Sequence, residues 1–160
     1  MIEDPKATVE IKRDENDVLQ AIFIQTTAMR NTYSQFGSLI HIDSTFSLNL
    51  ENFQAYICVA ENNNLNARPV SYCFLQSAVL PNLEFFYSSM ESNNDLSKTE
   101  IIIVDKDLTN IDLLKNYFKN EKLRILLCTF HSLKYIRQNV LPKVETEMDI
   151  KHVLNEKRFR

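Results

Sequence analysis

The chain has 160 residues, 44% of them hydrophobic and 24% charged, and 18 Lys and Arg against 21 Asp and Glu give a formal net charge of −3. This balance predicts one globular domain with no overall attraction to nucleic acid or to an anionic membrane. The one glycine, Gly37, excludes Rossmann and P-loop nucleotide sites, because those loops need several glycines. Three cysteines without paired spacing argue against a disulfide framework.

Neither a signal peptide nor a membrane span is apparent in the sequence. The first 17 residues carry six acidic and three basic side chains, unlike a secretory leader, and no apolar run approaches the ~18–20 residues of a membrane span. The sequence therefore predicts a nuclear or cytoplasmic protein that is not secreted, with no membrane partner and no nucleotide cofactor.

The first predicted elements are a hairpin and a short helix. Residues 8–13 alternate between apolar and polar, and residues 19–24 are β-branched and apolar, which predicts two strands joined by a turn. Apolar residues at helical spacing predict a helix over residues 27–36, followed by Gly37 at the position where glycine often ends a helix.

Three strands and two β-α steps follow. The strand over residues 101–104 is wholly apolar, which is typical of burial on both faces. This order predicts an α/β fold with a mixed sheet of three antiparallel strands, then two parallel β-α steps, and helices on both faces. The predicted elements are a strand from Leu39, strands over 53–60 and 70–76, a helix from Pro81, a strand over 101–104, a helix from Thr109, a strand over 125–128 and a helix over 129–140.

Two aspartates directly follow apolar strands, Asp43 after residues 39–42 and Asp105 after residues 101–104. If these strands are parallel neighbours, both carboxylates lie at one sheet edge and repel each other unless a cation lies between them. Mg²⁺ or Mn²⁺ suits such oxygen ligands, and a pair of such ions can hold the attacking and leaving oxygens of a phosphodiester. The alternative is that each aspartate only ends a strand as a turn residue.

Cys128 and His131 form a C-x-x-H step at the end of the last predicted strand. A structural zinc site needs about four ligands, usually from two such pairs. The other cysteines and histidines supply no second pair with matching spacing, so zinc is not expected in this segment.

Positive charge concentrates over residues 113–140, where Glu121 is the only acidic residue. Such a segment can contact nucleic-acid phosphates, and a solvated helix face is the alternative. The basic residues are Lys115, Lys119, Lys122, Arg124, Lys134 and Arg137.

Residues 101–140, through V-D-K-D followed by C-x-x-H, resemble the RNase H-like domain of Mutator-like (MULE) transposases, and most closely the zinc-finger SWIM-domain-containing proteins descended from them. Residues 25–49, with H-I-D-S-T-F, resemble the same family. The resemblance implies an RNase H-like domain over residues 27–140, an N-terminal hairpin extension over 1–26, and the start of a helical insertion or tail over 141–160.

The same resemblance implies an active site. Asp43 and Asp105 match the first two acids of a DDE triad that binds two divalent metals, and Cys128 and His131 match a signature placed near that site. The family's third acid, a Glu, follows a helical insertion beyond this signature, so we expect this chain to lack the C-terminal part of the fold that carries it.

The sequence departs from the family at two points, the third acid and an acid after the third strand. Glu145 and Glu147 have a spacing from Asp105 that other DDE enzymes tolerate, but Pro142 separates them from the last predicted strand. Relatives usually carry an acid after the third strand, where this chain has Gln76.

These features predict a transposase-derived RNase H-like domain, domesticated or a fragment, that is not catalytic alone and acts in DNA binding or nuclear regulation, with DNA as its partner in a longer protein. One alternative is an active DDE recombinase once the third acid is supplied, and another is a protein-interaction scaffold. We also expect the isolated chain to form a homodimer or aggregates, because an unfinished fold exposes apolar surface.

Overall fold

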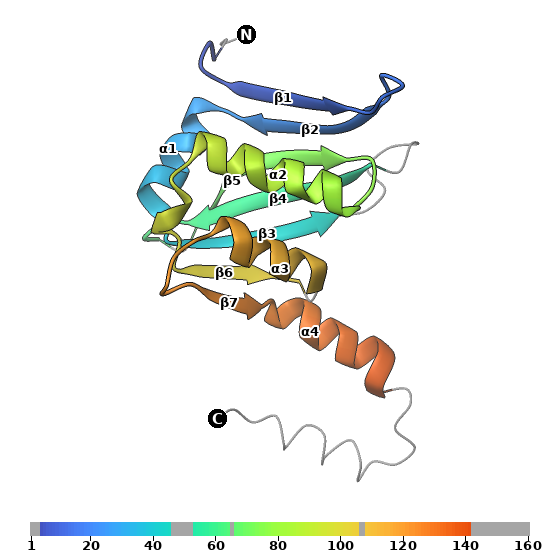
Figure 1. Cartoon of the computed structure of the whole chain (residues 1–160). Helices are drawn as coiled ribbons and strands as arrows, with labels where there is room; N and C mark the ends of the chain where they lie inside the picture. The colour runs from blue at the N-terminus through green and yellow to red at the C-terminus, as the bar shows by residue number, and fades with distance from the viewer. Residues whose placement is uncertain (1–3, 46–52, 65, 106–107, 142–160) are drawn as a thin grey trace.

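A single mixed sheet organises the part of the chain that the computed structural model describes, which is residues 4–45, 53–64, 66–105 and 108–141. In this part, seven strands lie in the order β1-β2-β5-β4-β3-β6-β7 (Figure 1). The elements are β1 Thr8–Arg13, β2 Leu19–Gln25, α1 Thr27–Phe36, β3 Leu39–Thr45, β4 Gln54–Glu61, β5 Ala67–Leu75, α2 Leu80–Asn93, the 3-10 turn η1 Leu96–Lys98, β6 Ile101–Val104, α3 Leu108–Tyr117, β7 Arg124–Leu127, α4 Thr129–Tyr135 and the π-helical turn η2 Ile136–Val140.

The strand pairing confirms the predicted fold class. β3, β4 and β5 pair antiparallel, and β6 and β7 then add in parallel to β3. The β1–β2 hairpin joins the same sheet, because β2 pairs antiparallel with β5. The domain boundaries expected at residues 26 and 140 stay predictions, and the expected tail from residue 142 onward lies outside the described residues.

The helices α1, α2 and α3 cover one face of the sheet. Tyr56 of β4 contacts the ring of Phe86 of α2, and Tyr33 of α1 and Leu114 of α3 belong to the same buried core. In Figure 1, α2 and α3 lie in front of the strands, and α4 leads away from the sheet beyond β7. The sequence predicted helices on both faces. In the described residues, the helices that pack across the sheet, α1, α2 and α3, lie on one face, called here the covered face.

The opposite face, called here the open face, carries side chains that are only half-buried. Ile57 and Ile103 point to it, because strand residues alternate between the faces. The prediction that β6 is buried on both faces is therefore wrong, since its burial alternates and only Ile102 and Val104 are enclosed. A short apolar run alone does not tell how many faces of a strand are covered.

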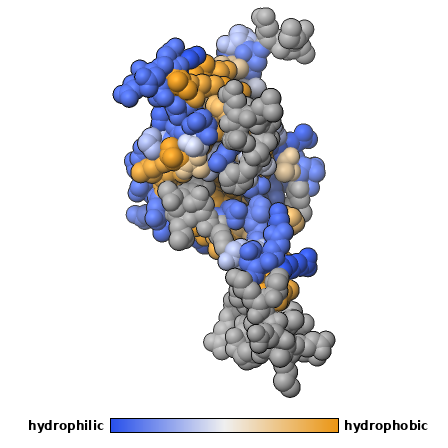
Figure 2. Space-filling view, turned by 90° about the vertical axis from the view of Figure 1, so that its right-hand side faces the viewer, coloured by the Kyte–Doolittle hydropathy of each residue, from blue (hydrophilic) through white to orange (hydrophobic). Residues whose placement is uncertain are grey.

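Apolar side chains also reach the surface at the N-terminal hairpin. Val9, Ile11 and Val18 are each more than half exposed, and Figure 2 shows hydrophobic surface toward this end of the molecule. Self-association of the isolated chain stays a prediction.

Among the helices of the described residues, none has both the length and the apolar character that a membrane crossing requires.

Gly37 follows α1, as predicted, but its conformation is not left-handed, with φ −70°. Its small size matters instead, because a Cβ atom at this position would lie 2.5 Å from the carbonyl oxygen of Tyr33. The Gly37 carbonyl also accepts a 2.7 Å hydrogen bond from the Thr99 hydroxyl, and that hydroxyl lies 2.6 Å from the hydroxyl of Tyr33. The turn therefore connects α1 to the segment that leads into β6.

We expect Gly37→Ala to lower the free energy of unfolding by about 1–3 kcal/mol, because the added methyl group forces the buried turn apart. Urea unfolding measures this change. Ser34→Ala, on the exposed side of α1, is the control and should leave stability close to that of the parent. Equal stability of the parent and Gly37→Ala would contradict the close approach at this turn.

Candidate functional site

The two aspartates of the predicted site lie on neighbouring parallel strands. Ile42 of β3 is paired with Val104 of β6, so Asp43 and Asp105 are the next residues along two adjacent strands. Both line one cavity of about 370 Å³ on the open face. The structure thus brings together the two residues that the sequence singled out, although they are 62 positions apart (105 − 43).

The C-x-x-H step reaches the same cavity. The Cys128 N–H donates a 2.7 Å hydrogen bond to the carbonyl of Val104, which places the start of α4 beside the end of β6. His131, in the first turn of α4, then lies with Nε2 3.9 Å from Oδ1 of Asp43. This separation suits an ion pair when the imidazole is protonated, and the pair is accessible, with Asp43 52% exposed and His131 26% exposed.

Backbone contacts also orient Asp43. The Ser44 N–H donates a 2.9 Å hydrogen bond to Oδ1 of Asp43, and the pairing of Asp43 with Ile57 of β4 continues β3 past the aspartate to Thr45. Asp43 therefore lies within a paired strand, while β6 ends one residue before Asp105. The reading of Asp43 as only a turn residue does not fit this placement.

A second polar pair lies at the other end of the cavity. His41 Nε2 is 3.1 Å from Oε1 of Glu61, although the two atoms are not aligned as a hydrogen bond. Because Ala60 pairs with Ile40, Glu61 lies beside the start of β3, four residues or about 13 Å from Asp43 along the strand. Sequence reasoning did not assign this pair to the site, but the alternation of β3 places His41 on the same face as Asp43.

The described residues offer two carboxylates to a cation and no larger set of ligands. In the described part of the chain, no three His, Cys, Asp or Glu side chains converge to hold a metal ion. Two carboxylates remain, and Mg²⁺ commonly binds through one or two carboxylates while keeping several waters. Cys58 and Cys73 are buried, and burial raises the pKa of both thiols, which keeps them protonated and poor metal ligands.

Three further positions bear on the acids of the site. Glu145 and Glu147 lie outside the described residues. Gln76 follows β5 and is not among the residues that line the cavity.

The six basic residues are spread over five parts of the fold and do not line the cavity of the aspartates. Lys115 belongs to α3, and Lys119 and Lys122 to the connection that follows it. Arg124 begins β7, Lys134 lies on α4 and Arg137 on η2. Lys115 and Lys119 line a separate groove between α3 and β7. Contact of these side chains with nucleic acid stays a prediction.

One family model covers most of the chain. The sequence model described as "Zinc finger SWIM domain-containing protein 1/3, RNaseH-like domain" matches residues 1–124. The match begins before the β1–β2 hairpin and includes Asp43 and Asp105, whereas Cys128 and His131 lie beyond it. The comparison with curated proteins gave no match.

Proposed function

Because the chain belongs to the family of RNase H-like domains of zinc finger SWIM domain-containing proteins 1/3, we propose that it is a domesticated, transposase-derived domain. In this proposal it binds DNA in the nucleus, holds one divalent cation weakly and does not cleave DNA on its own. The family supports a nuclease-like or transposase-like domain, and the finer assignment rests on the geometry of the two aspartates.

The observation that carries the proposal is the position of Asp43 and Asp105 on adjacent parallel strands, lining one cavity. Two carboxylates so placed favour a cation between them. The described residues supply no third metal-binding side chain at this point, whereas a pair of ions acting on a phosphodiester requires a fuller set of ligands. The active-recombinase alternative therefore needs an acid from outside the described residues.

The residues around the aspartates have defined parts in this proposal. The Ser44 N–H holds one oxygen of Asp43, which limits the orientations that the carboxylate adopts. Ile57 and Ile103 form apolar walls of the cavity and reduce its hydration. When bound, a divalent cation would neutralise the carboxylates and attract a phosphate oxygen.

We propose that DNA contacts the four basic side chains that do not line the groove between α3 and β7. These side chains are Lys122, Arg124, Lys134 and Arg137. All four residues are exposed. Exposed lysine and arginine side chains release counterions on meeting phosphates, so this binding should weaken as salt is raised. The cavity itself is lined by acidic side chains and therefore repels the DNA backbone in the absence of a cation.

Mn²⁺ binding tests the acid pair directly, because electron paramagnetic resonance counts free Mn²⁺. We expect one weak site per chain, with Asp43→Asn and Asp105→Asn each weakening it about tenfold or more and the double variant abolishing it. Asp112→Asn, an exposed acid on α3, is the charge-matched control and should bind like the parent. Mn²⁺ binding that survives in the double variant would refute the site.

Supercoiled plasmid DNA tests the rest of the proposal. With Mg²⁺ or Mn²⁺ present, the chain should retard the plasmid in a gel without nicking it, and Lys134→Glu with Arg137→Glu should reduce the retardation. Lys6→Glu with Lys98→Glu changes the charge equally outside the basic segment and should retain it. Nicked circles that disappear in Asp43→Asn would contradict the proposal and favour an active recombinase.

A further inference from the structure

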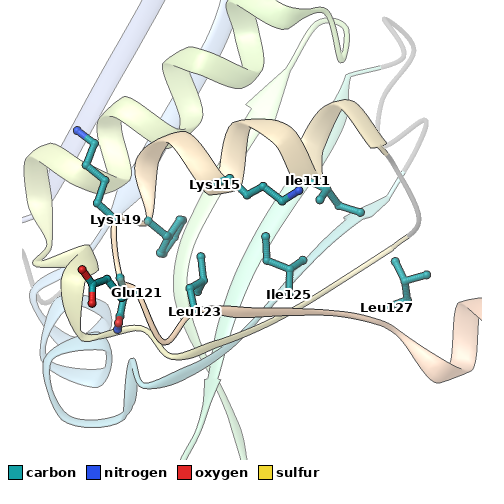
Figure 3. Close-up of a pocket in the computed structure, with 9 residues that line it drawn as sticks. Ile111, Lys115, Lys119, Glu121, Leu123, Ile125 and Leu127 are labelled. Atoms are coloured by element: carbon teal, nitrogen blue, oxygen red, sulfur yellow. The ribbon is translucent and has the colours of Figure 1, made fainter.

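A second hollow lies on the covered face of the sheet, between α3 and the last strand (Figure 3). We call it the α3–β7 groove. Its volume is about 720 Å³, and its apolar floor consists of Ile111, Phe118, Leu123, Ile125 and Leu127. Figure 3 shows Leu123, Ile125 and Leu127 pointing from the β7 segment toward α3. The groove shares no lining residue with the cavity of the aspartates.

The groove is uncovered because α3 is the last described helix that packs on the covered face, and β7 lies beyond it at the edge of the sheet. Ile102 pairs with Ile125 and Val104 with Leu127, so these four side chains share the covered face. The two β6 residues are fully buried, whereas Leu127 is 50% exposed. In the described part of the chain, β7 is one of the two edge strands, and no helix lies beyond α3 to cover it.

The rim of the groove is predominantly basic. Lys115 lies along the groove beneath α3, and Lys119 lies at the end of the groove with its ammonium group pointing away from Glu121, toward α2 (Figure 3). Glu121 is the only acidic residue of the lining. Lys119 approaches Glu91 only at 4.0 Å and keeps 77% of its side chain exposed, so it retains the capacity to meet another acidic group.

We propose that the α3–β7 groove binds an amphipathic helix of a partner protein, with an apolar stripe on one side and acidic residues along the flank that faces α3. The lining includes Ile125 and Leu127 but not Leu126, which lies on the open face. The occupant therefore lies in the layer of helices and does not extend the sheet. The apolar floor suits aliphatic side chains and offers no charged or hydrogen-bonding group to a phosphate backbone.

Synthetic helices of this character are the probe. Two peptides of about 12 residues carry the same leucine stripe, and their flank carries glutamate in one peptide and lysine in the other. Both are stapled, because unstapled helices of this length are marginally stable. Fluorescence anisotropy should show the glutamate peptide binding about tenfold more tightly at low salt, a preference that shrinks as salt screens the lysines.

Two leucines of β7 provide a matched pair of variants. Leu126 and Leu127 are 48% and 50% exposed but point to opposite faces. We expect Leu127→Asp to abolish binding of the glutamate peptide and Leu126→Asp to preserve it. Lys115→Glu, which leaves the apolar floor intact, should remove or reverse the preference for the glutamate peptide, whereas Lys98→Glu, on an exposed turn, should not change it.

Three kinds of result would each overturn the proposal. The first comes from the peptides, and is either no binding of both peptides up to about 1 mM or equal loss of binding in both leucine variants. The second is a dimer in sedimentation that Leu127→Asp alone dissociates, which makes a second copy the occupant. The third is duplex DNA that displaces the glutamate peptide and still binds Leu127→Asp, which makes the lysines a DNA contact. The Mn²⁺ site is measured separately, so either proposal can fail alone.

Discussion

The parallel pairing of β3 with β6 is the constraint on which the arrangement of the site depends. A slip of one residue would move every side chain of the strand to the other face, so the register decides whether Asp43 and Asp105 meet. Contacts at the start of both strands hold this register. The Ser38 carbonyl accepts hydrogen bonds from the N–H groups of Glu100 and Ile101, and the buried hydroxyl of Thr99 donates to Gly37. Contacts at the start of β3 and β6 therefore fix the positions of Asp43 and Asp105, which lie toward the other end of these strands.

The unequal covering of the two faces gives the domain two distinct surfaces. The open face carries the cavity with the aspartates, where polar groups gather along β3. The covered face carries the α3–β7 groove, where apolar side chains remain beyond the last packed helix. A ligand at one surface therefore need not contact residues of the other. In the two proposals, the cation and the partner helix therefore occupy separate surfaces of one small sheet.

Much of the fold could be predicted from the sequence, because local patterns determine it. Alternation, helical spacing and the position of Gly37 predicted the strands and helices, and the predicted strand ends singled out Asp43 and Asp105, although β3 continues past Asp43 to Thr45. Features that depend on packing between distant segments could not be found in this way. The half-burial of Ile103 depends on which face the helices cover, and the approach of Glu61 to His41 depends on the pairing of β3 with β4.

Crystals of the whole chain soaked in Mn²⁺ test the central claim most directly, because anomalous scattering locates the metal independently of any assay. The account predicts one anomalous peak between the carboxylates of Asp43 and Asp105, and its loss in Asp43→Asn crystals. No peak between these residues would contradict it, as would two peaks about 3.5–4 Å apart with a third acidic ligand, which is the arrangement of a complete two-metal site.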